Sequence, residues 1–135
     1  MFLPLYIKWN AINETGIALL DEQHRGIVSI INTFYYMMQK HEDAPSLYTC
    51  ISEALKNYSH IHFVTEEALL ETVQYKEIEK HKKAHTALGI EVERIEKQIA
   101  KDNDTRPLLE FLKKWWLGHI NEEDMLYVPY LSSQR

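Results

Sequence analysis

The chain has 135 residues, of which 45% are hydrophobic and 26% are charged, a composition typical of one compact globular domain. Its formal net charge of −5 disfavours a broad phosphate-binding face, so we expect no nucleic-acid partner. Cys50 is the single cysteine, which excludes an internal disulfide and a cysteine-based zinc or iron–sulfur site. Any bound metal must therefore have histidine and carboxylate ligands. The seven histidines are the unusual part of the composition.

The start of the chain is apolar, but residues 1–7 are too few for a membrane span and lack a basic leading region and a small-residue cleavage site. No other apolar run approaches the roughly 20 residues that a span requires. We therefore expect a cytoplasmic protein without a membrane partner. We expect residues 1–16 to form an irregular N-terminal arm, in which Trp9 packs over one end of the helices that follow.

Four stretches place apolar residues at alternating steps of three and four, which is the spacing of one helix face. The first extends from Ile17 to Met38, with either Phe34 or Tyr35 facing inward, and ends near Pro45. The second covers residues 51–73, and the third, which is the most regular, covers residues 78–99. No stretch shows the sustained alternation of a strand.

Residues 102–107 combine polar turn formers, a capping hydroxyl and a proline in the first helical turn, which predicts the start of a fourth helix. This helix is expected to end before Pro129. Four helices of about 20 residues with short connections favour an all-α, antiparallel up-down-up-down four-helix bundle. We expect the bundle to occupy residues 17–128 of a single domain that spans residues 1–135.

Several ionisable side chains fall on the inward faces, where a bundle should be apolar. They are His24, His62, Glu66, His81, His85 and His119. A buried polar group without a partner costs on the order of 1 to 3 kcal/mol, and a common ligand would remove this cost. His62 and Glu66 are four residues apart, as are His81 and His85, so each pair lies about one turn apart on one face. This geometry predicts a metal site.

The second acidic ligand is ambiguous from spacing alone. Asp124 lies five residues after His119, which takes it off the stripe of that histidine unless it reaches around the helix or the helix distorts locally. Glu122 and Glu123 compete with it for this role.

The number of candidate ligands favours two metal ions. His41, at a helix end, and His60, which faces away from His62, are expected at the surface. Five imidazoles and two carboxylates exceed the four or so ligands of one zinc. These donors suit iron, manganese, copper or zinc, whereas magnesium and calcium prefer nearly all-oxygen shells. If both carboxylates and one water-derived oxygen bridge two octahedral irons, each iron has three bridging oxygens. Five histidines, divided as three and two, then fill one iron and leave the other with one open position for a small ligand.

Four segments together resemble the hemerythrins, specifically the single-domain bacteriohemerythrins. They are Trp9…Gly16-Ile17…Asp21-Glu22-Gln23-His24, His62-Phe63-Val64-Thr65-Glu66-Glu67, His81-Lys82-Lys83-Ala84-His85 and Trp115…His119-Ile120…Asp124. The resemblance spans nearly the whole chain, and each of the seven ligand positions of the family holds the expected residue type.

The resemblance implies reversible dioxygen binding at a non-heme di-iron centre with an oxo or hydroxo bridge, for oxygen storage, delivery or scavenging. The ligands that it implies are His81, His85 and His119 for one iron, His24 and His62 for the other, and Glu66 and Asp124 as bridges. It also implies a dry oxygen pocket, for which the candidates are Ile27, Phe63, Trp115 and Trp116. Many relatives have an aliphatic residue in place of Trp116, so we expect this indole to narrow the pocket or its entry path.

Two other functions stay open, namely a di-iron oxidase or peroxidase-like enzyme and an oxygen or redox sensor that acts through a partner protein. Ferritin-like enzymes of the first kind use Glu-x-x-His pairs, and no glutamate lies three residues before any histidine of this chain. We therefore expect a monomeric oxygen-binding protein rather than an enzyme, with dioxygen as its partner. This expectation is compatible with slow peroxide or nitric oxide chemistry.

Overall fold

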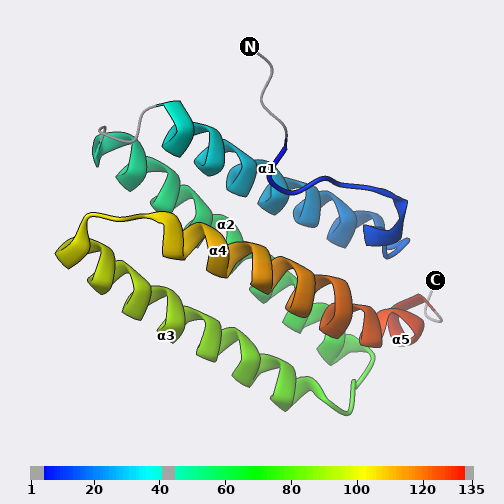
Figure 1. Cartoon of the computed structure of the whole chain (residues 1–135). Coiled ribbons are helices and arrows are strands. Elements are labelled where there is room, and N and C mark those ends of the chain that lie inside the picture. The colour runs from blue at the N-terminus through cyan, green and yellow to red at the C-terminus, as the bar shows by residue number, and fades with distance from the viewer. Residues whose placement is uncertain (1–4, 41–44, 133–135) are drawn as a thin grey trace. The chain divides into compact units, whose positions relative to one another are not determined.

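The computed structural model describes residues 5–40 and 45–132, and it contains helices and no strand within these ranges. The long helices are α1 (Ala18–Lys40), α2 (Pro45–Thr72) and α3 (Ile78–Asp102), followed by α4 (Arg106–Trp115) and its continuation (Figure 1). None of the described helices is both long and apolar enough to span a membrane. The chain divides into two compact units, Met1–His62 and Phe63–Arg135, and α2 passes from the first into the second.

In the first unit, the N-terminal arm is fixed to α1 by hydrogen bonds. The backbone N–H of Ile7 donates to Asn32 Oδ1 at 2.8 Å, and Asn32 Nδ2 donates to the carbonyl of Ile7 at 2.8 Å. A short 3-10 turn, Ala11–Asn13, interrupts the otherwise irregular arm. The guanidinium of Arg25 lies 5.1 Å from the ring centroid of Trp9, which places this tryptophan against the first turns of α1.

The two helices of the first unit run antiparallel and approach closely at a glycine. A Cβ added at Gly26 would overlap the ring and hydroxyl of Tyr58. Gly26 follows His24 by two residues, and Tyr58 precedes His62 by one turn. The missing side chain therefore permits the approach of α1 and α2 beside the two histidines. The inward face of α1 is as predicted, with Phe34 fully buried and Tyr35 partly exposed.

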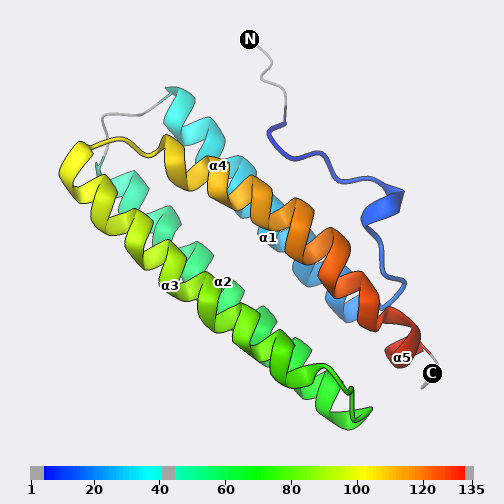
Figure 2. The same ribbon diagram turned by 60° about the horizontal axis from the view of Figure 1, so that its bottom comes forward.

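In the second unit the chain passes from the last part of α2 into α3 and then into α4. Its direction reverses at each connection, as Figure 1 and Figure 2 both show. The C-cap of α3 is Asn103, whose φ of 53° lies in the left-handed region and whose N–H donates to the carbonyl of Ile99. Asparagine tolerates this conformation better than most residues. Pro107 lies in the first turn of α4, as predicted, but the side chain of Thr105 makes no capping hydrogen bond.

The fourth helix is not one regular α-helix, and the helical structure continues past Pro129 rather than ending before it. After α4 the chain forms the π-helix η2 (Trp116–Glu123), the 3-10 segment η3 (Asp124–Tyr127) and the short helix α5 (Val128–Ser132). Pro129 lies in the first turn of α5, where its missing N–H breaks no helical hydrogen bond. The predicted division into an arm of residues 1–16 and a bundle of residues 17–128 stays a prediction.

Two glycine substitutions test the close approach of α1 and α2. Gly26→Ala is expected to lower the free energy of unfolding, because the methyl group would displace Tyr58. At Gly89 in α3, no atom lies within 4 Å of an added Cβ, so Gly89→Ala should raise that free energy by about 0.5 to 1 kcal/mol through helix propensity. Chemical denaturation followed by circular dichroism measures both variants, and equal stabilisation by the two would contradict the approach.

Candidate metal centre

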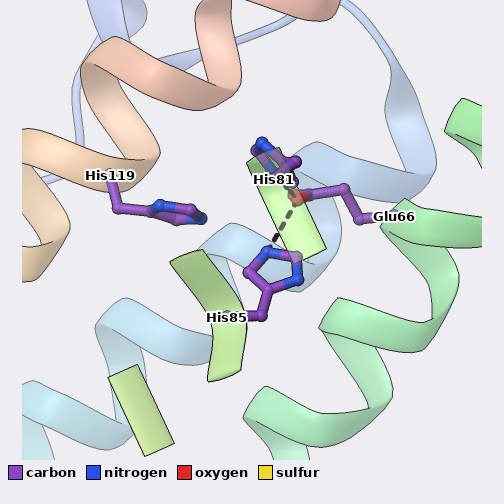
Figure 3. Close-up of side chains that lie close together, drawn as sticks. All are labelled: Glu66, His81, His85 and His119. Carbon is purple, nitrogen blue, oxygen red and sulfur yellow. Dashed lines mark hydrogen bonds and ion pairs between the residues drawn. The ribbon is translucent and has the colours of Figure 1, made fainter. Parts of the chain in front are cut away.

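Four ligand groups of the second unit converge on one point. Glu66 comes from α2, His81 and His85 from α3, and His119 from η2, and one ligand atom from each lies within 4.8 Å of the others. Figure 3 shows the three rings and the carboxylate pointing toward one another. Glu66 Oε1 contacts His81 Nε2 and lies 3.0 Å from His85 Nε2. All four side chains are buried, so the predicted i,i+4 histidine pair does face the interior.

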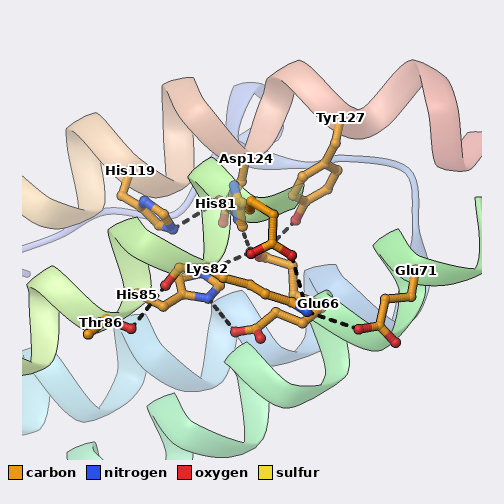
Figure 4. A network of polar contacts seen from close by, with 11 residues as sticks. Glu66, Glu71, His81, Lys82, His85, Thr86, His119, Asp124 and Tyr127 are labelled. Atoms are coloured by element: carbon orange, nitrogen blue, oxygen red, sulfur yellow. Dashed lines mark hydrogen bonds and ion pairs between the residues drawn. The ribbon is translucent and has the colours of Figure 1, made fainter. Parts of the chain in front are cut away.

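A change of helix type brings Asp124 to this cluster. In η2 the hydrogen bonds connect residues five apart, and the N–H of Asp124 donates to the carbonyl of His119. The wider turn puts these two residues on the same side, with His119 Nε2 and Asp124 Oδ1 3.2 Å apart (Figure 4). Asp124 is fully buried and Glu122 is exposed, while the side chain of Glu123 lies outside the described residues. Of the two alternatives that the sequence left for Asp124, the structure contains the local distortion of the helix.

Other contacts hold the ligand side chains in place. Tyr127, which is fully buried, donates its hydroxyl to Glu66 Oε2 at 2.9 Å. His85 Nδ1 lies 2.8 Å from Glu67 Oε2, and the ring of Phe63 stacks on that of His85 with 3.9 Å between centroids. Sequence reasoning missed the contacts of Tyr127 and Glu67. The available signals were a tyrosine three residues after Asp124 and a second glutamate directly after Glu66.

The carboxylates of this cluster favour positive charge at His81. Burial of the ring opposes its charged form, but hydrogen bonds and charge interactions with Asp124 and Glu66 outweigh burial and raise the pKa of His81 to about 10. His81 Nε2 lies 3.2 Å from Asp124 Oδ1. In the metal-free protein this imidazole is therefore protonated at neutral pH, and a cation that binds its nitrogen displaces the proton.

The first unit holds the other two inward histidines. His24 and His62 are both fully buried, and their ring centroids are 4.7 Å apart with the rings edge to face. His62 Nδ1 lies 2.9 Å from Gln23 Oε1. Because an amide oxygen only accepts hydrogen bonds, Nδ1 carries the proton of the neutral imidazole and Nε2 is left as the metal-binding nitrogen. His60 is exposed, as predicted, and His41 lies outside the described residues.

The candidates for an oxygen pocket differ in their surroundings. Ile27 of the first unit is fully buried, and in the second unit Trp116 is 1% exposed. Trp115 stacks on His119 with 5.9 Å between centroids, and it meets Phe63 edge to face at 6.0 Å. Phe63 and Trp115 thus cover the rings of His85 and His119 with apolar surface.

The donor chemistry of the second unit fits a transition metal. Three imidazole nitrogens and two carboxylate oxygens converge without a thiolate, a set that suits iron, manganese, copper or zinc. Two of these groups, Glu66 and Asp124, are fully buried carboxylates. Buried carboxylates require compensating positive charge. Protonated His81 supplies this charge in the metal-free protein, and a bound cation would supply it in its place.

Known proteins of the same kind match nearly the whole chain. Residues 15–131 match the family model of the hemerythrin HHE cation binding domain. A bacteriohemerythrin of Clostridium acetobutylicum is 32% identical over 126 residues, covering 89% of this chain and 97% of that protein. A bacteriohemerythrin of Pseudomonas paraeruginosa is 31% identical over 124 residues, covering 91% of this chain and 80% of that protein.

Solved structures agree with these matches. A crystal structure of a hemerythrin with a leucine-to-alanine substitution superimposes with a TM-score of 0.84 at 26% identity, covering 96% of this chain and 99% of that one. This similarity confirms the fold class predicted from the sequence, and the family match confirms the resemblance. The chain belongs to the hemerythrin family.

Proposed function

We propose that the protein binds dioxygen reversibly at a non-heme di-iron centre with an oxo or hydroxo bridge, for oxygen storage, delivery or scavenging. The observation that carries this proposal is the buried convergence of three imidazoles and two carboxylates in the second unit, in a chain of the hemerythrin family. When bound, such a centre supplies the electrons for reversible dioxygen binding. The proposed role is that of an oxygen-binding protein in the cytoplasm, acting as a monomer, rather than that of an enzyme.

All seven ligand positions enter the proposal. We assign His81, His85 and His119 to one iron, His24 and His62 to the other, and Glu66 and Asp124 to both. The burial of each of these side chains supports the assignment, since none is more than 8% exposed. The hydrogen bond from His62 Nδ1 to Gln23 also supports it, because it leaves Nε2 of that ring for a metal.

Aromatic and aliphatic side chains have the proposed role of excluding water. Phe63 and Trp115 lie against the rings of His85 and His119, and Ile27 and Trp116 are buried. A dry apolar surrounding strengthens electrostatic interactions and prevents loss of a reactive ligand by protonation. Tyr127 donates a hydrogen bond to Glu66 and so fixes the orientation of that carboxylate without supplying a charge.

The optical spectrum tests the function directly. Iron-loaded protein is reduced without oxygen, exposed to air and then deoxygenated over several cycles. We expect iron charge-transfer bands that appear with oxygen and vanish on its removal, because reversible binding returns the electrons to the metal. Irreversible oxidation accompanied by peroxide turnover would instead favour an enzyme and contradict the proposal.

A pair of variants tests the choice of Asp124 over its neighbours. Asp124→Ala is expected to lower the iron content of purified protein by at least half, because it removes a buried carboxylate that lies 3.2 Å from two imidazole nitrogens. Glu122→Ala removes an exposed acid from the same segment and should keep the full iron content. Metal analysis and the optical bands measure both variants, and equal losses would show that Asp124 is not specifically a ligand.

A third test concerns Trp116. Trp116→Leu replaces a buried indole with a smaller side chain, and we expect faster oxygen release and faster autoxidation because the pocket or its entry path opens. Leu117→Ala changes an exposed neighbour and serves as the matched control. Stopped-flow absorption measures both rates, with iron content as a check on folding. Rates equal to those of the unchanged protein would exclude a role for Trp116 in the pocket.

A further inference from the structure

Two of the buried histidine rings are hydrogen-bonded on the side opposite their metal-binding nitrogen, by acceptors of different charge. In the second unit His85 Nδ1 lies 2.8 Å from a carboxylate oxygen of Glu67. In the first unit His62 Nδ1 lies 2.9 Å from the amide oxygen of Gln23. The two contacts are of nearly the same length, whereas the acceptor is a carboxylate in one and a neutral amide in the other.

The contact between Glu67 and His85 leaves the ring little freedom. His85 Nε2 lies 3.0 Å from Glu66 Oε1 while Nδ1 faces Glu67 Oε2. Phe63 lies parallel to the ring, with 12° between the planes. A flip of the imidazole would lose both polar contacts, and a rotation out of its plane would also lose the stacking. Glu67 therefore fixes the tautomer with the proton on Nδ1 and presents Nε2 to the cluster.

Glu67 contacts this imidazole directly and also interacts electrostatically with Lys82. The nearby cation Lys82 bonds to Glu71, with 3.0 Å between Nζ and Oε1, and the side chain of Glu67 is only 28% exposed. Hydrogen bonds to a carboxylate are stronger than those to a neutral amide. A carboxylate behind an imidazole also raises the basicity of that ligand toward a metal, an effect that the neutral Gln23 does not supply to His62.

We propose that Glu67 and Gln23 are positioning residues that make the two metal positions unequal. Glu67 strengthens binding through His85, so the position that includes His81, His85 and His119 fills first, and Gln23 leaves the position of His24 and His62 weaker. The second position also has two imidazoles where the first has three, which lowers its affinity for a metal further. This inference rests on the proposed function only for the existence of two metal positions.

Two nearly isosteric substitutions in metal-free full-length protein test the proposal, with Co²⁺ as the probe because its visible bands report each binding step. Glu67→Gln keeps an acceptor but removes the charge, and should weaken the first step about 10-fold. Gln23→Glu adds a charge behind His62 and should strengthen the second step by a similar factor. Glu53→Gln removes the charge of an exposed residue of the same helix and should leave both steps unchanged.

A second measurement separates positioning from a merely structural role. Nitrogen-15 NMR of the metal-free protein should show the His85 proton on Nδ1 in the unchanged protein and in Glu67→Gln, and a mixture of tautomers in Glu67→Ala. Equal weakening of cobalt binding by Glu67→Gln and Glu53→Gln, or an unchanged first step in Glu67→Gln, would overturn the proposal. Cobalt steps that follow the prediction in a protein without a reversible oxygen cycle would overturn the proposed function alone.

Discussion

The burial of two carboxylates in the second unit is the constraint that explains the protonation of His81 and the change of helix type before Asp124. Glu66 and Asp124 are completely removed from solvent, and an ionised carboxylate in such surroundings is costly unless positive charge lies beside it. In the metal-free protein the protonated ring of His81 supplies this charge, which is why its pKa rises to about 10 although burial opposes it. A metal ion in contact with several of these groups would supply more charge than one proton, so metal binding and folding are expected to support each other.

The π-helix η2 is the clearest local consequence of this constraint. A regular α-helix would direct residues 119 and 124 to different sides, whereas the wider turn of η2 allows His119 and Asp124 to approach within 3.2 Å. π-Helical turns are rare and occur frequently at functional sites. The irregular geometry of this segment is therefore explained by the ligands that it carries, and the apolar residues Trp115 and Trp116 at its start remain buried.

The sequence was sufficient to predict which side chains of the site are buried wherever the site follows regular helical spacing. The i,i+4 spacing of His81 and His85 correctly predicted a buried pair, because residues one turn apart share a helix face. Spacing could not decide between Asp124 and its neighbours, since the change of helix type is a tertiary effect. Sequence reasoning also missed the contacts of Gln23 and Glu67, which join side chains of two different helices. The sequence left open a local distortion of the fourth helix near Asp124, but no proline or glycine pattern marks the start of η2.

The most direct test of the proposed di-iron centre is anomalous diffraction at the iron absorption edge from crystals of iron-loaded protein. We expect two iron peaks per chain, about 3.5 to 4 Å apart as in other two-metal sites. His81, His85 and His119 should contact one peak, His24 and His62 the other, and Glu66 and Asp124 both. A single iron peak, or two peaks without a shared carboxylate, would contradict this account.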